Sequence, residues 1–221
     1  MFNRNTKYRN ATKTLNLKLS KLYAITDTRI SGLSHAEQVL RLSEGGAKFI
    51  QLREKHKSPR EFYDEAKAAL EIARERDVKI IINDRVDIAL ALRADGVHLG
   101  QDDMPPDAAR KILGEIAIIG FSTHNIAQAI EAVNLPIDYI AIGPIFTTNT
   151  KENPDPVIGL KGLRSVRDAI GDFPLVAIGG IGKEDTEDVF ANGASCVAVI
   201  SALLENPDEI TERVRSFEYR L

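Results

Sequence analysis

Polar side chains close two neighbouring apolar stretches near the middle of the chain. Asn83 and Asp84 end one stretch, and Gln101 and Asp103 follow the other. In α/β proteins with parallel strands, the loops that follow the strands meet at one end of the sheet, so these side chains are expected to lie together. Mg²⁺ is typically held by one or two carboxylates, several waters and substrate phosphate oxygens. The sequence therefore predicts that Asp84 and Asp103 share one divalent cation.

Each aspartate also has a purely structural interpretation. Asp84 could cap the helix predicted at 86–92, and Asp103 could begin the helix that Pro105 opens, since Asp is favoured at helix N-termini. Both alternatives stay open for the single residues, but four polar side chains at two strand ends favour a shared site.

A cationic cluster follows the preceding apolar stretch. Gln51, Arg53 and Lys55 alternate along the chain and would point the same way in extended backbone. Arg can bridge two oxygens in a fork and Lys acts as a point charge, so the cluster suits a pyrophosphate. A salt bridge at the rim of the protein, with Glu54 or another acid, is the alternative.

Glycines and hydroxyls near the C-terminal end predict a second phosphate site. Gly179 and Gly180 follow one apolar stretch, and Ile200 and Ser201 end the next. In eight-stranded barrels these two positions are the usual phosphate site, where glycines let backbone N–H groups approach the anion.

A long segment without helix or strand signals, residues 143–156, lies just upstream. It carries hydroxyls at alternate positions, Thr148 and Thr150, followed by Lys151. Loops of this length in compact domains are often functional, so this one is predicted to wrap a phosphorylated ligand. A loop rich in threonine without any function is the alternative.

Two histidines fall near these segments. His98 lies inside a predicted strand, where a histidine satisfied by hydrogen bonds in the interior is favoured over a metal ligand. His124 follows another strand and could transfer protons, or it could simply begin a helix.

Eight strands, each followed by a helix, are predicted to position these residues. The strands are continuous apolar runs rather than alternating ones, which is typical of parallel strands with both faces buried. Residues 21–221 are thus predicted to form a single (β/α)₈ barrel domain, with an open doubly wound sheet as the alternative. The predicted strands are 22–26, 49–53, 79–83, 96–99, 116–121, 139–142, 175–178 and 196–200.

Helix start signals support this alternation. Ser34 with Glu37, and Ser58 with Glu61, form two capping boxes, and Pro59 suits the first helical position.

Composition limits the classes of function. Of the 221 residues, 43% are hydrophobic and 28% are charged, as in ordinary soluble globular proteins, and the formal net charge is −3. This balance predicts no nucleic-acid surface, and no apolar run approaches the ~20 residues that span a bilayer. Cys196 is the only cysteine, which excludes an intrachain disulfide and fits a reducing, cytoplasmic location.

Residues 1–20 are basic and free of acids; a flexible leader is predicted, with organelle targeting as the alternative.

From about Leu22 onward the chain resembles the thiamine phosphate synthase family. The matching motifs are LYAIT, IQLREK, IINDRVDIAL, GVHLGQDDMP, GFSTHN, GPIFTTNTK, AIGGI and VAVISA. Family members join an aminopyrimidine-methyl pyrophosphate to a thiazole phosphate, releasing pyrophosphate and forming thiamine phosphate. The reaction is expected to be dissociative, through a pyrimidine-methyl cation.

The resemblance also implies residue roles. It implies Mg²⁺ bound by Asp84 and Asp103, and catalytic roles for Arg53, Lys55, Ser122 and Lys151. The pyrimidine pyrophosphate would contact Gln51, Arg53, Lys55, Asn83, Ser122 and Lys151, and the thiazole phosphate would contact Thr148, Thr150, Gly180, Ile200 and Ser201. Two departures from the family pattern, Asp102 and Asn149, carry no assigned role.

Two other functions are weighed against this one. Thiazole tautomerases resemble the synthases but typically lack the metal aspartates, which are present here as Asp84 and Asp103. A non-catalytic barrel that binds thiamine phosphates would not need groups that stabilise a leaving pyrophosphate. The expected partners are therefore small-molecule substrates, with no nucleic acid or membrane and a possible homo-oligomer.

Overall fold

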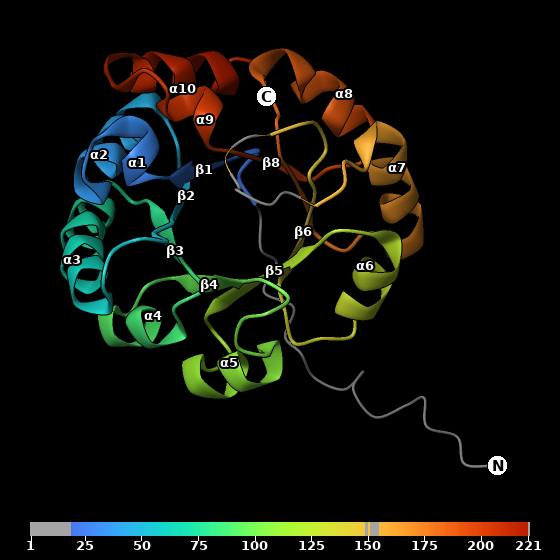
Figure 1. Ribbon diagram of the computed structural model, residues 1–221, viewed down its shortest axis with the longest axis horizontal. Helices are drawn as coiled ribbons and strands as arrows, with labels where there is room; N and C mark the ends of the chain where they lie inside the picture. The colour runs from blue at the N-terminus through green and yellow to red at the C-terminus, as the bar shows by residue number, and fades with distance from the viewer. Residues whose placement is uncertain (1–18, 149, 151–154, 221) are drawn as a thin grey trace.

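The computed structural model describes residues 19–148, 150 and 155–220, and within them the strands form one closed barrel. All neighbouring strands pair in parallel and in chain order, and the last strand pairs with the first (Figure 1). This confirms the predicted (β/α)₈ barrel and excludes the open sheet. The strands are β1 (Leu22–Thr26), β2 (Phe49–Leu52), β3 (Lys79–Asn83), β4 (Gly96–Leu99), β5 (Ile118–Thr123), β6 (Tyr139–Ile142), β7 (Leu175–Ile178) and β8 (Cys196–Val199).

Helices form a ring around the barrel (Figure 1). They are α1 (Thr28–Ser31), α2 (His35–Gly45), α3 (Pro59–Glu75), α4 (Val86–Leu92), α5 (Pro106–Leu113), α6 (Ile126–Ala132), α7 (Gly159–Ile170), α8 (Thr186–Ala191), α9 (Ser201–Leu204) and α10 (Ile210–Glu218). Two 3₁₀ turns, Lys183–Asp185 and Pro207–Glu209, precede α8 and α10. No helix in the described ranges is long and apolar enough to cross a membrane.

Strand residues alternate between two cores, which explains why the strand sequences are mostly apolar. In β1, Leu22 and Ala24 belong to the core between the strands and the helices, whereas Tyr23 and Ile25 belong to the core inside the barrel. Successive side chains of a strand point to opposite faces, so a strand that is buried on both faces needs an apolar residue at nearly every position.

Strand β5 lies two residues later than predicted. Ile116 is 85% exposed, and the first residue of the strand, Ile118, donates its N–H to Asp95 O at 2.9 Å. The polar end of the strand is stabilised because Thr123 Oγ1 donates to Ala141 O at 3.1 Å. The run of apolar residues predicted a strand that begins and ends two residues too early. In the structure Ser122 therefore lies inside the strand rather than in the following loop.

Both predicted capping boxes are present and fix the starts of α2 and α3. Ser34 Oγ accepts from Glu37 N at 3.2 Å, and Ser58 Oγ accepts from Glu61 N at 3.3 Å. The glutamates reach back to the backbone N–H groups of Ser34 and Ser58 at 3.0 and 2.9 Å.

Removing one of these caps has a predictable cost. Ser58→Ala is expected to lower the free energy of unfolding by about 1 kcal/mol, because the first turn of α3 loses the acceptor for an otherwise unpaired N–H. Urea denaturation measures this loss. Ser165→Ala is the control, since this hydroxyl bonds Lys161 O in the middle of α7 and caps nothing. Equal losses in the two variants would contradict the capping role.

Candidate active site

A cavity of about 540 Å³ opens at the end of the barrel where the strands terminate. Every described residue for which the sequence predicts a role lines it, although the strands that supply them are far apart in the chain. Those residues are Gln51, Arg53, Lys55, Asn83, Asp84, Asp103, Ser122, Thr148, Thr150, Gly180, Ile200 and Ser201. Lys151 lies outside the described residues, as do residues 1–18 of the predicted leader.

Asp84 follows β3 in a left-handed backbone conformation, with φ of +60°. This conformation is uncommon for a residue with a side chain, although Asp tolerates it better than most. Its N–H donates to His98 O at 2.8 Å, which ties β3 to β4. The residue before α4 is Arg85, and α4 has no side-chain cap, so the capping interpretation of Asp84 is wrong. The backbone instead holds the Asp84 carboxylate in the cavity.

Asp103 also fails to cap a helix, because Pro105 occupies that position before α5. Its Oδ2 accepts from Gly100 N at 2.6 Å and closes the turn after β4. Burial raises the pKa of Asp103 above its ordinary value; the Gly100 N–H opposes this, and the neighbouring Asp84 carboxyl raises the pKa further. A half-buried carboxyl group whose charge is disfavoured by a neighbouring carboxyl is suited to binding a cation.

Two cations of the cavity form ion pairs with acidic side chains. Lys55 Nζ pairs with Asp84 Oδ2, and Arg53 Nη1 pairs with Asp27 Oδ2 at 2.5 Å. The alternative of a salt bridge with another acid is therefore confirmed, with Asp27 and Asp84 as the partners rather than Glu54. Asp27, which the sequence did not single out, also caps α1 by accepting from Arg29 N at 3.0 Å.

One amide in the cavity has no partner. Asn83 Nδ2 is buried and makes no hydrogen bond to any residue that the structure describes. Buried donors are rarely left unpaired unless a ligand or water completes them. Together with the two carboxylates and the two cations, this free N–H donor fits a ligand whose anionic oxygens also bind a hard divalent cation.

A chain of hydrogen bonds crosses the barrel interior from Gln51 to Ser122, which both line the cavity. Gln51 Nε2 donates to Tyr23 OH at 2.8 Å, Tyr23 OH lies 2.9 Å from Tyr139 OH, and Tyr139 OH lies 3.0 Å from His98 Nδ1. His98 Nε2 lies 2.8 Å from Ser122 Oγ and completes the chain. The two tyrosines were not predicted, because only the closed barrel brings them together.

His98 is thus an interior histidine satisfied by hydrogen bonds, as the sequence favoured. Burial lowers the pKa of His98 to about 4, so the ring is neutral at pH 7. A neutral ring offers one donor and one acceptor, which matches its two hydroxyl partners. This arrangement fixes the direction of the Ser122 hydroxyl at the cavity wall.

Removing one hydroxyl tests how much this chain of hydrogen bonds contributes to the stability of the fold. Tyr139→Phe is expected to lower the free energy of unfolding by about 1–3 kcal/mol, because His98 Nδ1 and Tyr23 OH each lose a partner in a buried site. Urea denaturation against Tyr219→Phe, a ring that is 94% exposed, provides the comparison. A loss no larger than that of the control would show that water replaces the hydroxyl at no cost.

His124 lies at the cavity wall after β5, with Nδ1 2.9 Å from Gly143 O and 3.4 Å from Asp155 Oδ2. It does not begin α6, because Asn125 takes that position and accepts from Gln128 N at 2.9 Å. The alternative that His124 is a helix-start residue is therefore wrong, whereas its role in proton transfer stays a prediction.

The opposite side of the cavity is built from glycine and hydroxyl groups. Gly179 and Gly180 have φ of +102° and +65°, and a Cβ on Gly180 would lie 2.4 Å from Thr147 O. The backbone therefore packs against the loop that carries Thr148 and Thr150, whose hydroxyls lie 3.4 Å apart. Ser201 begins the four-residue helix α9, which is too short for a periodic pattern to predict.

The chain matches a family model described as thiamine monophosphate synthase over residues 22–203. It is 49% identical to the thiamine-phosphate synthase of Clostridium novyi over 189 residues, which cover 85% of this chain and 92% of that protein. It is 44% identical to the thiamine-phosphate synthase of Chloroflexus aurantiacus over 196 residues, 88% of this chain and 89% of that protein. Among solved structures, a thiamine phosphate pyrophosphorylase from Pyrococcus furiosus superposes with a TM-score of 0.81 and 39% identity, covering 90% and 94% of the two chains.

Proposed function

The chain belongs to the thiamine monophosphate synthase family, transferases of thiamine biosynthesis, and from this premise we propose the reaction and the residues that perform it. The substrates are 4-amino-2-methyl-5-(diphosphooxymethyl)pyrimidine and hydroxyethylthiazole phosphate or its carboxylated form. The products are thiamine phosphate and pyrophosphate, with CO₂ in addition from the carboxylated thiazole.

One observation supports the proposal most strongly. A single cavity has an acidic and cationic side, with Asp84, Asp103, Arg53 and Lys55, and a separate side of glycines and hydroxyls, with Gly180 and Thr148. A pyrophosphate with Mg²⁺ suits the first side, and a monophosphate suits the second. Two phosphorylated reactants would thus be held in one enclosure with their reacting ends facing each other.

The acidic side fits magnesium by its donors. Asp84 and Asp103 offer hard oxygen ligands, and substrate phosphate oxygens would supply others. Bound there, Mg²⁺ would neutralise charge on the pyrophosphate as it leaves.

Cationic residues of the chain stabilise the rest of the charge on the leaving pyrophosphate. Arg53 and Lys55 exchange their present partners, Asp27 and Asp84, for pyrophosphate oxygens as charge grows on the leaving group. Lys151 is proposed to contact the same group. Interactions that strengthen as charge develops lower the barrier more than interactions already present in the ground state.

The pyrimidine is proposed to lie over the interior hydrogen-bond chain, between Gln51 and Ser122. When pyrophosphate leaves, a pyrimidine-methyl cation forms, which the amino group of the ring stabilises. The thiazole nitrogen then attacks this cation. Little proton transfer by side chains is needed, and the cavity contributes by holding the reactants in line and by keeping water away from the cation.

The test is direct product detection. The purified chain is incubated with both substrates, with and without Mg²⁺, and thiamine phosphate is measured after oxidation to its fluorescent product. Product that depends on Mg²⁺ supports the proposal. No product, with the substrates verified by an active relative, would overturn it, and isomerisation of the thiazole carboxylate phosphate would then be assayed.

A further inference from the structure

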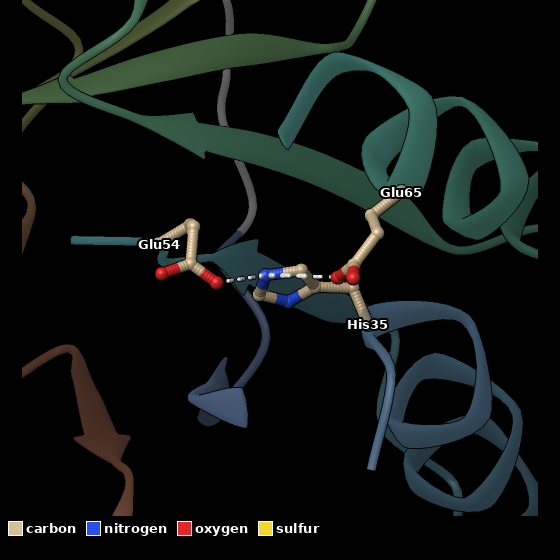
Figure 2. Close-up of side chains that lie close together, drawn as sticks. All are labelled: His35, Glu54 and Glu65. Atoms are coloured by element: carbon tan, nitrogen blue, oxygen red, sulfur yellow. Dashed lines mark ion pairs between the residues drawn. The ribbon is translucent and has the colours of Figure 1, made fainter. Parts of the chain in front are cut away.

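A second polar cluster lies outside the cavity, between the barrel and its first long helices. His35 is the first residue of α2, Glu54 follows β2, and Glu65 lies on α3 (Figure 2). One ligand atom from each residue lies within 4.8 Å of the others. His35 is fully buried, and none of the three lines the cavity described above. Three elements of the fold therefore converge on one polar point.

The hydrogen bonds of Thr26 determine which ring nitrogen of His35 carries a hydrogen and which carries a lone pair. Thr26 Oγ1 donates its single hydrogen to Gln51 O at 3.1 Å. It must therefore accept from His35 Nδ1, which lies 2.7 Å away. The Nδ1 atom therefore carries a hydrogen, and in the neutral ring Nε2 is left with the lone pair.

The distances around Nε2 are too long for hydrogen bonds. His35 Nε2 lies 3.6 Å from Glu54 Oε2 and 3.9 Å from Glu65 Oε2 (Figure 2). Both His35 Nε2 and Glu65 Oε2 are buried without a hydrogen-bond partner among the described residues. N–H···O hydrogen bonds span about 2.7–3.2 Å, whereas tetrahedral ligands bonded to one metal at about 2.1 Å lie about 3.4 Å apart. The spacing is closer to coordination than to direct hydrogen bonding.

The outer contacts of the cluster also resemble those of a metal site. The remaining oxygen of Glu54 accepts from His56 N at 2.8 Å, and the remaining oxygen of Glu65 accepts from Lys57 Nζ. Thr28 Oγ1 donates to Glu54 Oε2 at 3.0 Å, which leaves that oxygen a further lone pair. Metal ligands are typically oriented by such outer hydrogen bonds, including one from the second nitrogen of each histidine.

We propose that His35, Glu54 and Glu65 bind a divalent transition-metal ion, for which Zn²⁺ is the best chemical match. One imidazole and two carboxylates suit zinc, whereas magnesium prefers oxygen ligands alone. Burial lowers the pKa of His35, which agrees with a neutral ring whose lone pair is available. The side chains of Glu65 and Lys57 are 28% and 30% exposed, so the cluster lies near the protein surface.

This ion would have a structural role. It would join the start of α2 and the middle of α3 to the loop after β2, and Glu54 lies in that loop between Arg53 and Lys55. Thr26, which orients His35, also accepts from Arg53 N at 3.3 Å. The site would thereby fix the backbone that presents both cations, but it stands independently of the proposed reaction.

The proposal is tested by zinc binding rather than by activity. The full chain without a histidine tag is stripped with a chelator, and Zn²⁺ is titrated against a chromophoric chelator in excess Mg²⁺. One equivalent is expected to bind tightly to the wild type. Glu65→Gln is expected to weaken binding by at least ~100-fold, since losing even an outer partner of a zinc site costs 10–100-fold.

Matched controls separate this site from surface binding. Asp64→Asn removes the same charge one residue away, from a side chain that is 54% exposed and pairs with Arg60, and it should bind zinc like the wild type. His56→Gln removes an exposed histidine and should also leave the affinity unchanged. Thermal melts of the metal-free variants establish that each is folded before titration.

Further measurements distinguish a cluster that binds a metal ion from one that holds only a proton. Co²⁺ bound in place of Zn²⁺ should give visible absorption bands in the wild type that Glu65→Gln lacks. A folded wild type that binds no Zn²⁺ at micromolar concentrations would overturn the proposal and leave His35 held by a proton or a water. Equal affinities for wild type and Glu65→Gln would overturn it as well.

Discussion

Asp84→Asn is expected to lower kcat by about 10²–10³-fold, because the leaving pyrophosphate loses much of its charge stabilisation. Asn is chosen because it tolerates the left-handed backbone that this position requires, with φ of +60°. The variant therefore removes the proposed metal ligand and the partner of Lys55 without straining the turn after β3. The measurement is the formation of thiamine phosphate as a function of Mg²⁺ concentration.

The same experiment separates chemistry from binding. Affinity for the thiazole phosphate should survive in Asp84→Asn, because the glycine and hydroxyl side of the cavity is untouched. Asp87→Asn is the control: it removes the same charge three residues later, from a side chain that is 66% exposed and pairs with Arg85. A wild-type dependence on Mg²⁺ in Asp84→Asn would contradict the metal assignment.

The barrel could be predicted because its signals are local and repeated. A strand buried on both faces is apolar at nearly every position, and in this chain each such run is followed by a helix. Ser34 and Ser58 mark two of these helices with capping boxes. The carboxyl ends of parallel strands meet at one end of the barrel, so Asp84 and Asp103 could be placed together despite their separation in sequence. Their sharing of a cavity follows from topology alone.

The remaining features depend on contacts that no local pattern encodes. The hydroxyls of Tyr23 and Tyr139, 116 residues apart, meet only because β1 and β6 face each other across the closed barrel. Polar residues inside a strand also make its predicted end wrong. Ser122 and Thr123 pair with β6 as part of β5, although the apolar run that predicted the strand ends before them. The His35 cluster is of the same kind, because its three residues come from two helices and a loop that pack together only in the folded barrel.

Gly180→Ala is expected to lower kcat/KM for the thiazole phosphate by about 10²-fold, because displacing reactive groups by even ~1 Å has effects of this size. A Cβ at this position would lie 2.4 Å from Thr147 O and 3.0 Å from the carbonyl carbon of Phe146. Both are backbone atoms and cannot rotate away, so the loop that carries Thr148 must move. Steady-state kinetics with the thiazole phosphate as the varied substrate measures the effect.

Gly159→Ala is the control that separates the steric clash at Gly180 from the energetic cost of the left-handed backbone conformation. Gly159 has the same φ as Gly180, +65°, but a Cβ there would meet nothing within 4 Å. Each alanine incurs about 1–2 kcal/mol for the left-handed conformation, so both variants should lose stability, while only Gly180→Ala should lose kcat/KM. Equal kcat/KM values in the two variants would mean that the loop accommodates the extra carbon freely. Close packing of Gly180 against Thr147 would then not shape the proposed phosphate site.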